Sequence, residues 1–298
     1  MKIEEFISYL KKQRHYSNLT ISSYKSDLLQ FEKFLSQDNP EYLLQKDDSI
    51  IDSKCIRAWI MTLSENNIET RSINRKISSL RAYFKWIEIN NINFVNPMEK
   101  IINPKTPKRK ILAMTEDDTE KLFSIKPNEE DFNEMRNYLI LELLYSTGMR
   151  QAELLSLKET DINYNKDYLN VIGKGNKERI IPIGKKIITD LTKYIDFKRR
   201  LNISETALMV NKDGRKLSKY QLYSIVHKKL ENYDVSEKSP HEFRHTCATH
   251  LVKEGADIIN VKNLLGHTSL SATEVYINTT IEELKKEYKR SFEHKLNN

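Results

Sequence analysis

Features of secreted and membrane proteins are scarce in this sequence. The 298 residues include only two cysteines, Cys55 and Cys247, which lie far apart in sequence, and two cysteines do not make a disulfide framework. No apolar run approaches the ~18 residues expected of a membrane-spanning helix. The first residues include Glu4 and Glu5, where a secretory signal would be apolar. We therefore expect a soluble, cytoplasmic protein, and its length allows two domains that each bury a core.

Positive charge is unevenly distributed along the chain. The net formal charge is +7, but residues 101–110 include four basic residues and no acidic one. Residues 171–230 carry a formal charge of about +10. Two concentrated basic regions indicate that the chain contacts a polyanion at two places. An ordinary solvated, lysine-rich surface is the alternative interpretation.

The first hundred residues follow the periodicity of amphipathic helices. The clearest one extends from about Thr70 to Asn90, with apolar residues at helical spacing and basic residues on another face. We interpret this basic face as a DNA-binding surface, and it consists of Arg71, Arg75, Lys76 and Arg81. A solvated surface helix would show the same pattern. We expect residues 1–102 to form a helical domain.

A basic segment that contains proline separates this domain from the rest of the chain. Asn96-Pro97 ends the helical pattern, and Pro104 and Pro107 follow. Proline with unopposed positive charge is typical of an extended linker that follows a DNA backbone. We assign residues 103–111 to this linker. Its predicted DNA contacts are Lys105, Lys108, Arg109 and Lys110.

Residues 112–298 are expected to mix helices with a small β-sheet. Two apolar runs at 168–172 and 179–183, joined by a turn that contains glycine, predict a β-hairpin. A helix that is apolar on much of its surface ends at Gly148. Further helices are expected at about 185–200, 218–231, 241–254, 257–265 and 281–295. The predicted fold class is therefore mainly α with a small β-sheet (α+β).

Candidate phosphate-binding and acid–base groups lie in several short motifs. Arg150 comes directly after the end of the apolar helix, and its guanidinium suits two phosphate oxygens. Lys174 lies between two glycines at the predicted hairpin tip and is placed to protonate a leaving oxygen. Lys177 and Arg179 follow as further predicted DNA contacts. A structural ion pair and a solvated basic turn are the respective alternatives.

His241 and Arg244 lie three residues apart and share a face of a predicted helix. Pro240 fits the first turn of that helix, so His241 lies near a helix N-terminus, where anions are favoured. Its imidazole titrates near neutral pH and can move a proton. The pairing with Arg244 favours a phosphate site over an ordinary buried histidine.

The segment 241–245 also matches the His-Glu-x-x-His pattern of zinc proteases. Zinc needs a third ligand, and no histidine follows at the spacing of the extended motif. Arg244 would also put a positive charge beside the metal. A zinc metalloprotease is therefore a remote alternative, and we predict no metal site.

A histidine and a tyrosine complete the candidate set. His267 follows Gly266 at the end of a predicted helix, and Tyr276 lies nine residues later. A phenol with a pKa of ~10 is a poor nucleophile unless cations and a base stabilise its anion. Two arginines, a lysine and the imidazoles supply such an environment, so we predict that Tyr276 attacks a phosphodiester.

Taken in order, these motifs resemble the tyrosine recombinase (integrase) family, and most of all its Xer-type site-specific recombinases. The resemblance depends on residues 146–154, 172–179, 241–246 and 264–267, and length and domain order also fit. It implies an N-terminal SAM-like core-binding domain of four to five helices. A catalytic domain with a C-terminal exchange helix would follow, and that helix would dock on a neighbouring protomer or in cis.

The resemblance implies a role for each candidate in cutting and rejoining DNA. Tyr276 would form a 3′-phosphotyrosyl bond and release a 5′ hydroxyl, while Arg150 and Arg244 bind the non-bridging phosphate oxygens. Lys174 would act as general acid toward the 5′ oxygen. His241 would assist proton transfer and orientation, and His267 would donate a hydrogen bond to the phosphate. One ester replaces another, so neither ATP, magnesium nor any other cofactor is required.

The partners implied by the resemblance are DNA and other recombinase protomers. They are duplex DNA with two inverted half-sites and a tetrameric synaptic complex, formed with itself or with a paralogous recombinase. The biological role would be chromosome-dimer resolution or the integration, excision or inversion of a mobile element. A type IB topoisomerase without strand exchange is the alternative enzyme, and a DNA-binding protein with an inactive site is the alternative non-enzyme.

Overall fold

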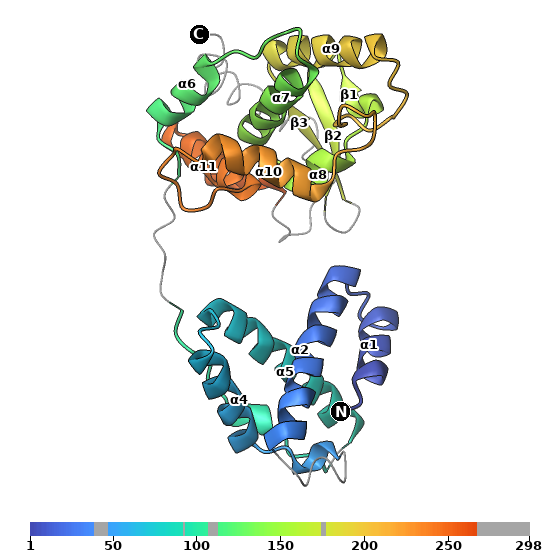
Figure 1. Cartoon of the computed structure of the whole chain (residues 1–298), viewed down its shortest axis with the longest axis vertical. Helices are drawn as coiled ribbons and strands as arrows, with labels where there is room; N and C mark the ends of the chain where they lie inside the picture. The colour runs from blue at the N-terminus through green and yellow to red at the C-terminus, as the bar shows by residue number, and fades with distance from the viewer. Residues whose placement is uncertain (39–46, 92, 107–112, 174–176, 267–298) are drawn as a thin grey trace. The chain divides into compact units, whose positions relative to one another are not determined.

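The computed structural model describes residues 1–38, 47–91, 93–106, 113–173 and 177–266 (Figure 1). The chain divides into two compact units, Met1–Arg109 and Lys110–Asn298. The described part is mostly helical and contains one small antiparallel sheet, which confirms the predicted fold class. None of the helices in the described ranges combines the length and the apolar character needed to cross a bilayer.

The N-terminal unit packs its helices around an aromatic core. Its described elements are α1 (Ile3–Lys12), α2 (Asn18–Asp38), η1 (Asp48–Ile50), α4 (Ser53–Glu65), α5 (Thr70–Asn90) and η2 (Pro97–Lys100). Phe31 and Trp59 bring their ring centroids to 4.9 Å in this core, and Phe6 meets Tyr83 edge-on at 5.4 Å. The helix predicted over 70–90 is confirmed as α5, which buries its apolar face here.

Polar side chains set where the helices begin. Asp52 caps α4 by accepting hydrogen bonds from the backbone N–H groups of Lys54 and Cys55, both at 2.9 Å. Thr115 and Asp118 form the reciprocal capping box that starts the first helix of the C-terminal unit. These caps satisfy N–H groups that have no partner inside the helix.

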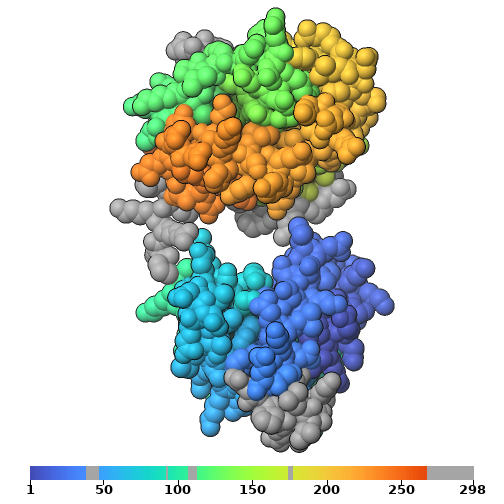
Figure 2. All heavy atoms as spheres, viewed as in Figure 1, coloured from blue at the N-terminus to red at the C-terminus, as the bar shows by residue number. Residues whose placement is uncertain are grey.

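The C-terminal unit surrounds a small sheet with helices. Its described helices are α6 (Glu116–Ser124), α7 (Phe132–Thr147), α8 (Gln151–Ser156), η3 (Glu159–Asp161), α9 (Lys185–Arg200), α10 (Lys219–Leu230), α11 (Pro240–Lys253) and α12 (Ile258–Leu265). The strands β1 (Ile162–Asn163), β2 (Tyr168–Ile172) and β3 (Glu178–Pro182) pair antiparallel in that order. In Figure 2 the orange segments α10 and α11 cover part of one face of this unit.

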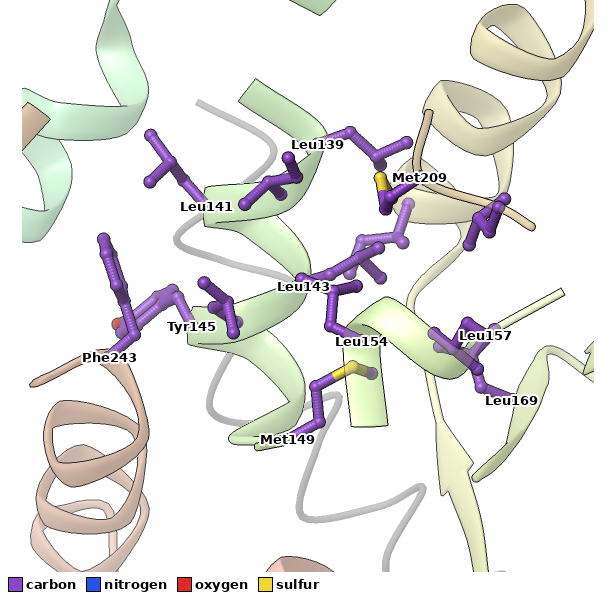
Figure 3. Close-up of a cluster of buried hydrophobic side chains, with 14 of the residues drawn as sticks. Leu139, Leu141, Leu143, Tyr145, Met149, Leu154, Leu157, Leu169, Met209 and Phe243 are labelled. Carbon is purple, nitrogen blue, oxygen red and sulfur yellow. The ribbon is translucent and has the colours of Figure 1, made fainter. Parts of the chain in front are cut away.

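The helix α7 forms the centre of this unit. It contacts both α9 and α11, and its leucines are buried on several sides (Figure 3). Leu139 and Leu143 extend toward Met209, whereas Tyr145 lies beside Phe243 of α11. Each such buried apolar side chain contributes roughly 1.5–3 kcal/mol. A helix buried this completely holds its C-terminal end firmly, and Arg150 follows directly after that end.

Candidate functional site

Three arginine side chains bind the C-terminal end of α12. Each of the last three carbonyl groups there accepts one guanidinium hydrogen bond: Leu264 from Arg179 Nε at 3.0 Å, Leu265 from Arg244 Nη2 at 2.5 Å, and Gly266 from Arg150 Nη2 at 3.0 Å. Carbonyls at a helix C-terminus have no partner inside the helix and carry partial negative charge, which favours cations. The described chain therefore gathers three cations directly before residue 267.

The backbone around Gly148 places Arg150 at this position. Gly148 ends α7 in the left-handed conformation, with φ of 57°, and its N–H donates to Leu144 O at 3.1 Å. A Cβ atom at Gly148 would lie 2.3 Å from Leu265 Cδ2, so the end of the Leu265 side chain would have to move, and the positive φ itself favours glycine. Arg150 then forms the N-cap of α8. The end of α7, the start of α8 and the end of α12 thus meet.

A buried carboxylate organises two of the arginines. Glu153 is 3% exposed and accepts hydrogen bonds from the Arg150 backbone N–H at 2.7 Å and from Arg150 Nη1 at 2.8 Å. Arg179 donates to both Glu153 oxygens, at 2.9 and 2.8 Å. Burial alone raises the pKa of Glu153, but the bonds from Arg179 and Arg150 outweigh it and lower that pKa to about 2. Glu153 is therefore ionised at neutral pH.

Arg244 reaches the same place from α11. Its Nη1 donates to Gly148 O at 2.7 Å, in addition to the bond from Nη2 to Leu265. Burial, followed by repulsion from Arg150, lowers the pKa of Arg244 to about 10. Arg244 therefore remains a cation at neutral pH, and the effect of Arg150 on its pKa reflects how close the two guanidinium groups lie.

The Arg150 side chain is more open to solvent than that of Arg179. It is 31% exposed, against 13% for Arg179. Its bonds to Glu153 and Gly266 use two of the five guanidinium N–H donors. The arrangement therefore offers an anion a partly exposed guanidinium, backed by a second cation on α11.

The start of α11 places His241 as predicted, at the first turn of a helix with Pro240. Its backbone N–H donates to Ser239 Oγ at 3.3 Å, and its side chain is exposed. Glu242, the base in the zinc-protease pattern, is only 2% exposed and accepts a hydrogen bond from Thr246 Oγ1 at 3.4 Å. In the described ranges, no three His, Cys, Asp or Glu residues come close enough to hold a metal ion.

Several predicted residues lie outside the described part of the chain: Lys108, Arg109, Lys110, Lys174, His267 and Tyr276. Two of them have a described neighbour. Gly173, before Lys174, donates its N–H to Lys177 O at 2.7 Å and closes the base of the hairpin tip. Gly266, before His267, is bound by Arg150. Lys177 itself is exposed.

The basic face predicted on α5 is only partly a surface. Arg71 is exposed, and Arg75 is half-exposed while it pairs with the buried Asp27. Lys76 differs from the expectation, because it is 6% exposed and donates to Asp27 at 3.2 Å and to Gln30 at 2.6 Å. Lys76 therefore belongs to the contact between α2 and α5 and is not on the exposed basic face.

Arg81 binds the beginning of the linker. Its Nη2 donates to Ile101 O at 3.2 Å and to Asn103 Oδ1 at 3.0 Å. Asn74, which lies earlier on α5, donates to Pro104 O at 3.0 Å. Asn74 also donates to Thr106 Oγ1 at 2.9 Å, so the linker follows α5 as far as residue 106, and Lys105 within this stretch is exposed.

Glu153 is the important residue of this cluster that no sequence motif indicates as a site residue. Its place three residues after Arg150, at the N3 position of α8, matches the glutamate of a capping box. That sequence signal predicts a helix start. It does not predict that the same carboxylate binds Arg179 on β3.

Comparison with known proteins identifies relatives over nearly the whole chain. Residues 113–283 match the model of the phage integrase family, and residues 3–89 match the phage integrase N-terminal SAM-like domain. The chain is 36% identical to tyrosine recombinase XerC of Staphylococcus aureus (strain MSSA476) over 291 residues, which cover 96% of this chain and 94% of that protein.

Two solved structures show the same fold. The XerH site-specific recombinase bound to a palindromic difH substrate aligns with a TM-score of 0.69 at 20% identity, over 97% of this chain and 84% of that one. A lambda integrase(75–356) dimer bound to a COC′ core site aligns with a TM-score of 0.67 at 19% identity, over 92% and 97%.

Proposed function

Because this chain belongs to the phage integrase family, as a tyrosine recombinase of the Xer type, we propose that Arg150 and Arg244 hold the DNA phosphate at which it recombines DNA. The observation that carries this proposal is that their guanidinium groups bind neighbouring carbonyls, those of Gly266 and Leu265. A phosphate between them would receive charge-assisted hydrogen bonds from both sides.

The proposed reaction replaces one phosphate ester with another. The Tyr276 oxygen forms a bond to phosphorus while the bond from phosphorus to the DNA 5′ oxygen breaks, which leaves a 3′-phosphotyrosyl intermediate. Lys174 gives a proton to the leaving 5′ oxygen, and His241 assists removal of the phenol proton. The reverse sequence, with a 5′ hydroxyl from another strand, rejoins the DNA.

The two arginines act on the charge that builds during this exchange. Negative charge increases on the non-bridging oxygens in the transition state, where fixed donors stabilise it most. Arg150 and Arg244 are fixed by Glu153 and by the carbonyls at two helix ends. In this proposal His267, next to the bound Gly266, adds a further hydrogen bond to the phosphate.

We extend the proposal to the assembly. Structures with this fold include a recombinase on a palindromic substrate and a lambda integrase tetramer on a Holliday junction. In our proposal this chain binds duplex DNA with two inverted half-sites in the cytoplasm, as a tetramer with itself or with a paralogue. Chromosome-dimer resolution is the proposed role, with mobile-element integration, excision or inversion as the second candidate. The 36% sequence identity to tyrosine recombinase XerC, over 96% of the chain, favours recombination over a type IB topoisomerase activity.

Trapping the covalent intermediate tests the proposed reaction. Wild type and Tyr276→Phe are incubated in EDTA with a pool of nicked duplexes, and SDS-resistant protein–DNA adducts are isolated. We expect an adduct with wild type alone, on the 3′ side of the cut. No adduct together with no DNA binding would contradict the proposed function.

A further inference from the structure

Arg179 was predicted as a DNA contact, but its donors point into the protein. Nη1 and Nη2 each bind one Glu153 oxygen, and Nε binds Leu264 O at 3.0 Å. The side chain is 13% exposed. Little of this guanidinium is left for a phosphate.

Two glycines make room for this side chain. A Cβ atom at Gly266 would lie 3.1 Å from Arg179 Nη1, and a Cβ atom at Gly173 would lie 3.3 Å from the same nitrogen. Both distances are tighter than most Cβ contacts, so a side chain at either glycine would push the guanidinium by a few tenths of an ångström. The guanidinium is therefore enclosed between the base of the hairpin tip and the end of α12, and it touches Glu153 in between.

We propose that Arg179 is a positioning residue that keeps Arg150 available to the DNA phosphate. This inference rests on the proposed function. Arg179 supplies two of the four hydrogen bonds that Glu153 accepts, whereas the Arg150 side chain supplies one and its backbone N–H the other. By binding both carboxylate oxygens, Arg179 limits the Arg150 guanidinium to a single bond with Glu153.

Removing Arg179 would leave Glu153 as a buried anion with half of its donors. Buried carboxylates require compensating donors, and an arginine beside a carboxylate favours a two-bond fork. The Arg150 guanidinium is already in contact with Glu153 at 2.8 Å. It would therefore turn both of its terminal nitrogens toward Glu153 and away from Gly266 and the phosphate.

The test compares Arg179→Met with wild type in the full-length protein. Methionine keeps much of the length of the side chain and removes its charge and donors. We expect cleavage of a nicked duplex in single turnover to slow by about 10²-fold, the size of effect that a displacement of ~1 Å in a catalytic group produces. DNA affinity, and its dependence on salt concentration, should stay at the wild-type values.

Lys177→Met is the matched control, because Lys177 is exposed on the same hairpin. Lys177 is a predicted phosphate contact, so Lys177→Met should weaken DNA binding and reduce the slope of log K against log[salt] by ~0.9. If Arg179→Met behaves in this way, or if it cleaves at the wild-type rate, the proposed positioning role is wrong.

Neutralising Glu153 separates positioning from general damage to the fold. In Arg179→Met/Glu153→Gln, the carboxylate that would capture Arg150 is gone, while a glutamine at N3 still caps α8. We expect cleavage to recover about tenfold over Arg179→Met, which lies within the coupling found between residues of one hydrogen-bond network. Loss of structure alone would make the double variant slower, and that result would overturn the inference.

The result with wild type distinguishes failure of the proposed function from failure of the positioning role of Arg179. If wild type neither binds DNA nor forms the adduct, the proposed function fails and this inference fails with it. If wild type forms the adduct and only the expectations for Arg179 are not met, the proposed function stands and the positioning role is rejected.

Discussion

In each unit of the protein, a buried carboxylate lies between two cations. In the N-terminal unit, Asp27 of α2 is 1% exposed and binds Arg75 and Lys76 of α5, with Ser79 Oγ at 2.7 Å. In the C-terminal unit, Glu153 is 3% exposed and binds Arg150 and Arg179. The chemical groups are nearly the same in the two clusters.

The clusters differ in what else their cations contact. Lys76 ends on Asp27 and Gln30, so the N-terminal cluster closes on the two helices that it joins. Arg150 and Arg179 continue from Glu153 to the carbonyl end of a third segment, α12. A buried ion pair alone therefore does not distinguish a structural contact from a reactive site. The two are distinguished by what the remaining hydrogen-bond donors of the cations contact.

The largest effect in this comparison is expected at Asp27. Asp27→Asn leaves Lys76 as a buried ammonium without its counter-ion, which should lower the free energy of unfolding of the N-terminal unit by about 3 kcal/mol. Both tryptophans, Trp59 and Trp86, lie in this unit, so urea unfolding followed by tryptophan fluorescence reports on it alone.

A second substitution checks the cause of that loss. Asp27→Asn/Lys76→Met removes the unpaired charge together with its partner and should recover most of the lost stability, because apolar replacements of buried ion pairs are often neutral. A double variant that is no more stable than Asp27→Asn would show that the charge is not the reason.

We expect the opposite behaviour at Arg244, where a substitution should slow DNA cleavage while the protein remains folded. Arg244→Lys keeps the charge but loses the fork that reaches Gly148 and Leu265. We expect single-turnover cleavage to slow by about 10²–10³-fold, as for removal of one fixed donor to a transition-state anion. A rate within tenfold of wild type would argue against a phosphate contact.

The sequence predicts the elements of this fold better than it predicts the contacts between them. The periodicity that places α5 at 70–90 and the glycine that ends α7 are local signals, and the structure confirms both. β1 was not predicted, because a strand of two residues has no detectable periodicity. Lys76 was placed on the exposed face, although it lies beside Ile77 at the contact with α2.

The candidate site shows the same limit. Motifs select Arg150 and Arg244 because their residue types and neighbours suit phosphate. Nothing local to Arg179 tells whether its guanidinium points to solvent or to a glutamate 26 positions earlier. That direction depends on how β3, α8 and α12 meet, which is a property of the tertiary structure.

The Glu153 cluster should make the stability of the C-terminal unit depend on pH in the acidic range. Glu153 has a folded pKa of about 2, below its ordinary value of 4.5, so its contribution is present above about pH 4.5 and is lost as pH falls toward 2. At pH 7 it amounts to on the order of 3 kcal/mol. Glu153→Gln should therefore be clearly less stable than wild type at pH 7 and closer to wild type at pH 3.

Far-UV circular dichroism during urea unfolding measures this difference, and the tryptophan signal of the N-terminal unit provides an internal control. The tryptophan transition should be the same in both proteins at each pH. A stability difference between the proteins that stays constant from pH 7 to pH 3 would contradict the depressed pKa of Glu153.

The smallest effect is expected on the exposed face of α5, outside both clusters. Arg71 is exposed and is a predicted DNA contact, so Arg71→Ala should weaken DNA binding several-fold and reduce the slope of log K against log[salt] by ~0.9. Lys33→Ala, an exposed lysine of α2 outside the predicted basic face, is the control and should leave the slope unchanged. Fluorescence anisotropy titrations at several salt concentrations measure both. Equal slopes for Arg71→Ala and wild type would remove Arg71 from the DNA-binding face and leave Arg75, tied to Asp27, as the nearest candidate on that helix.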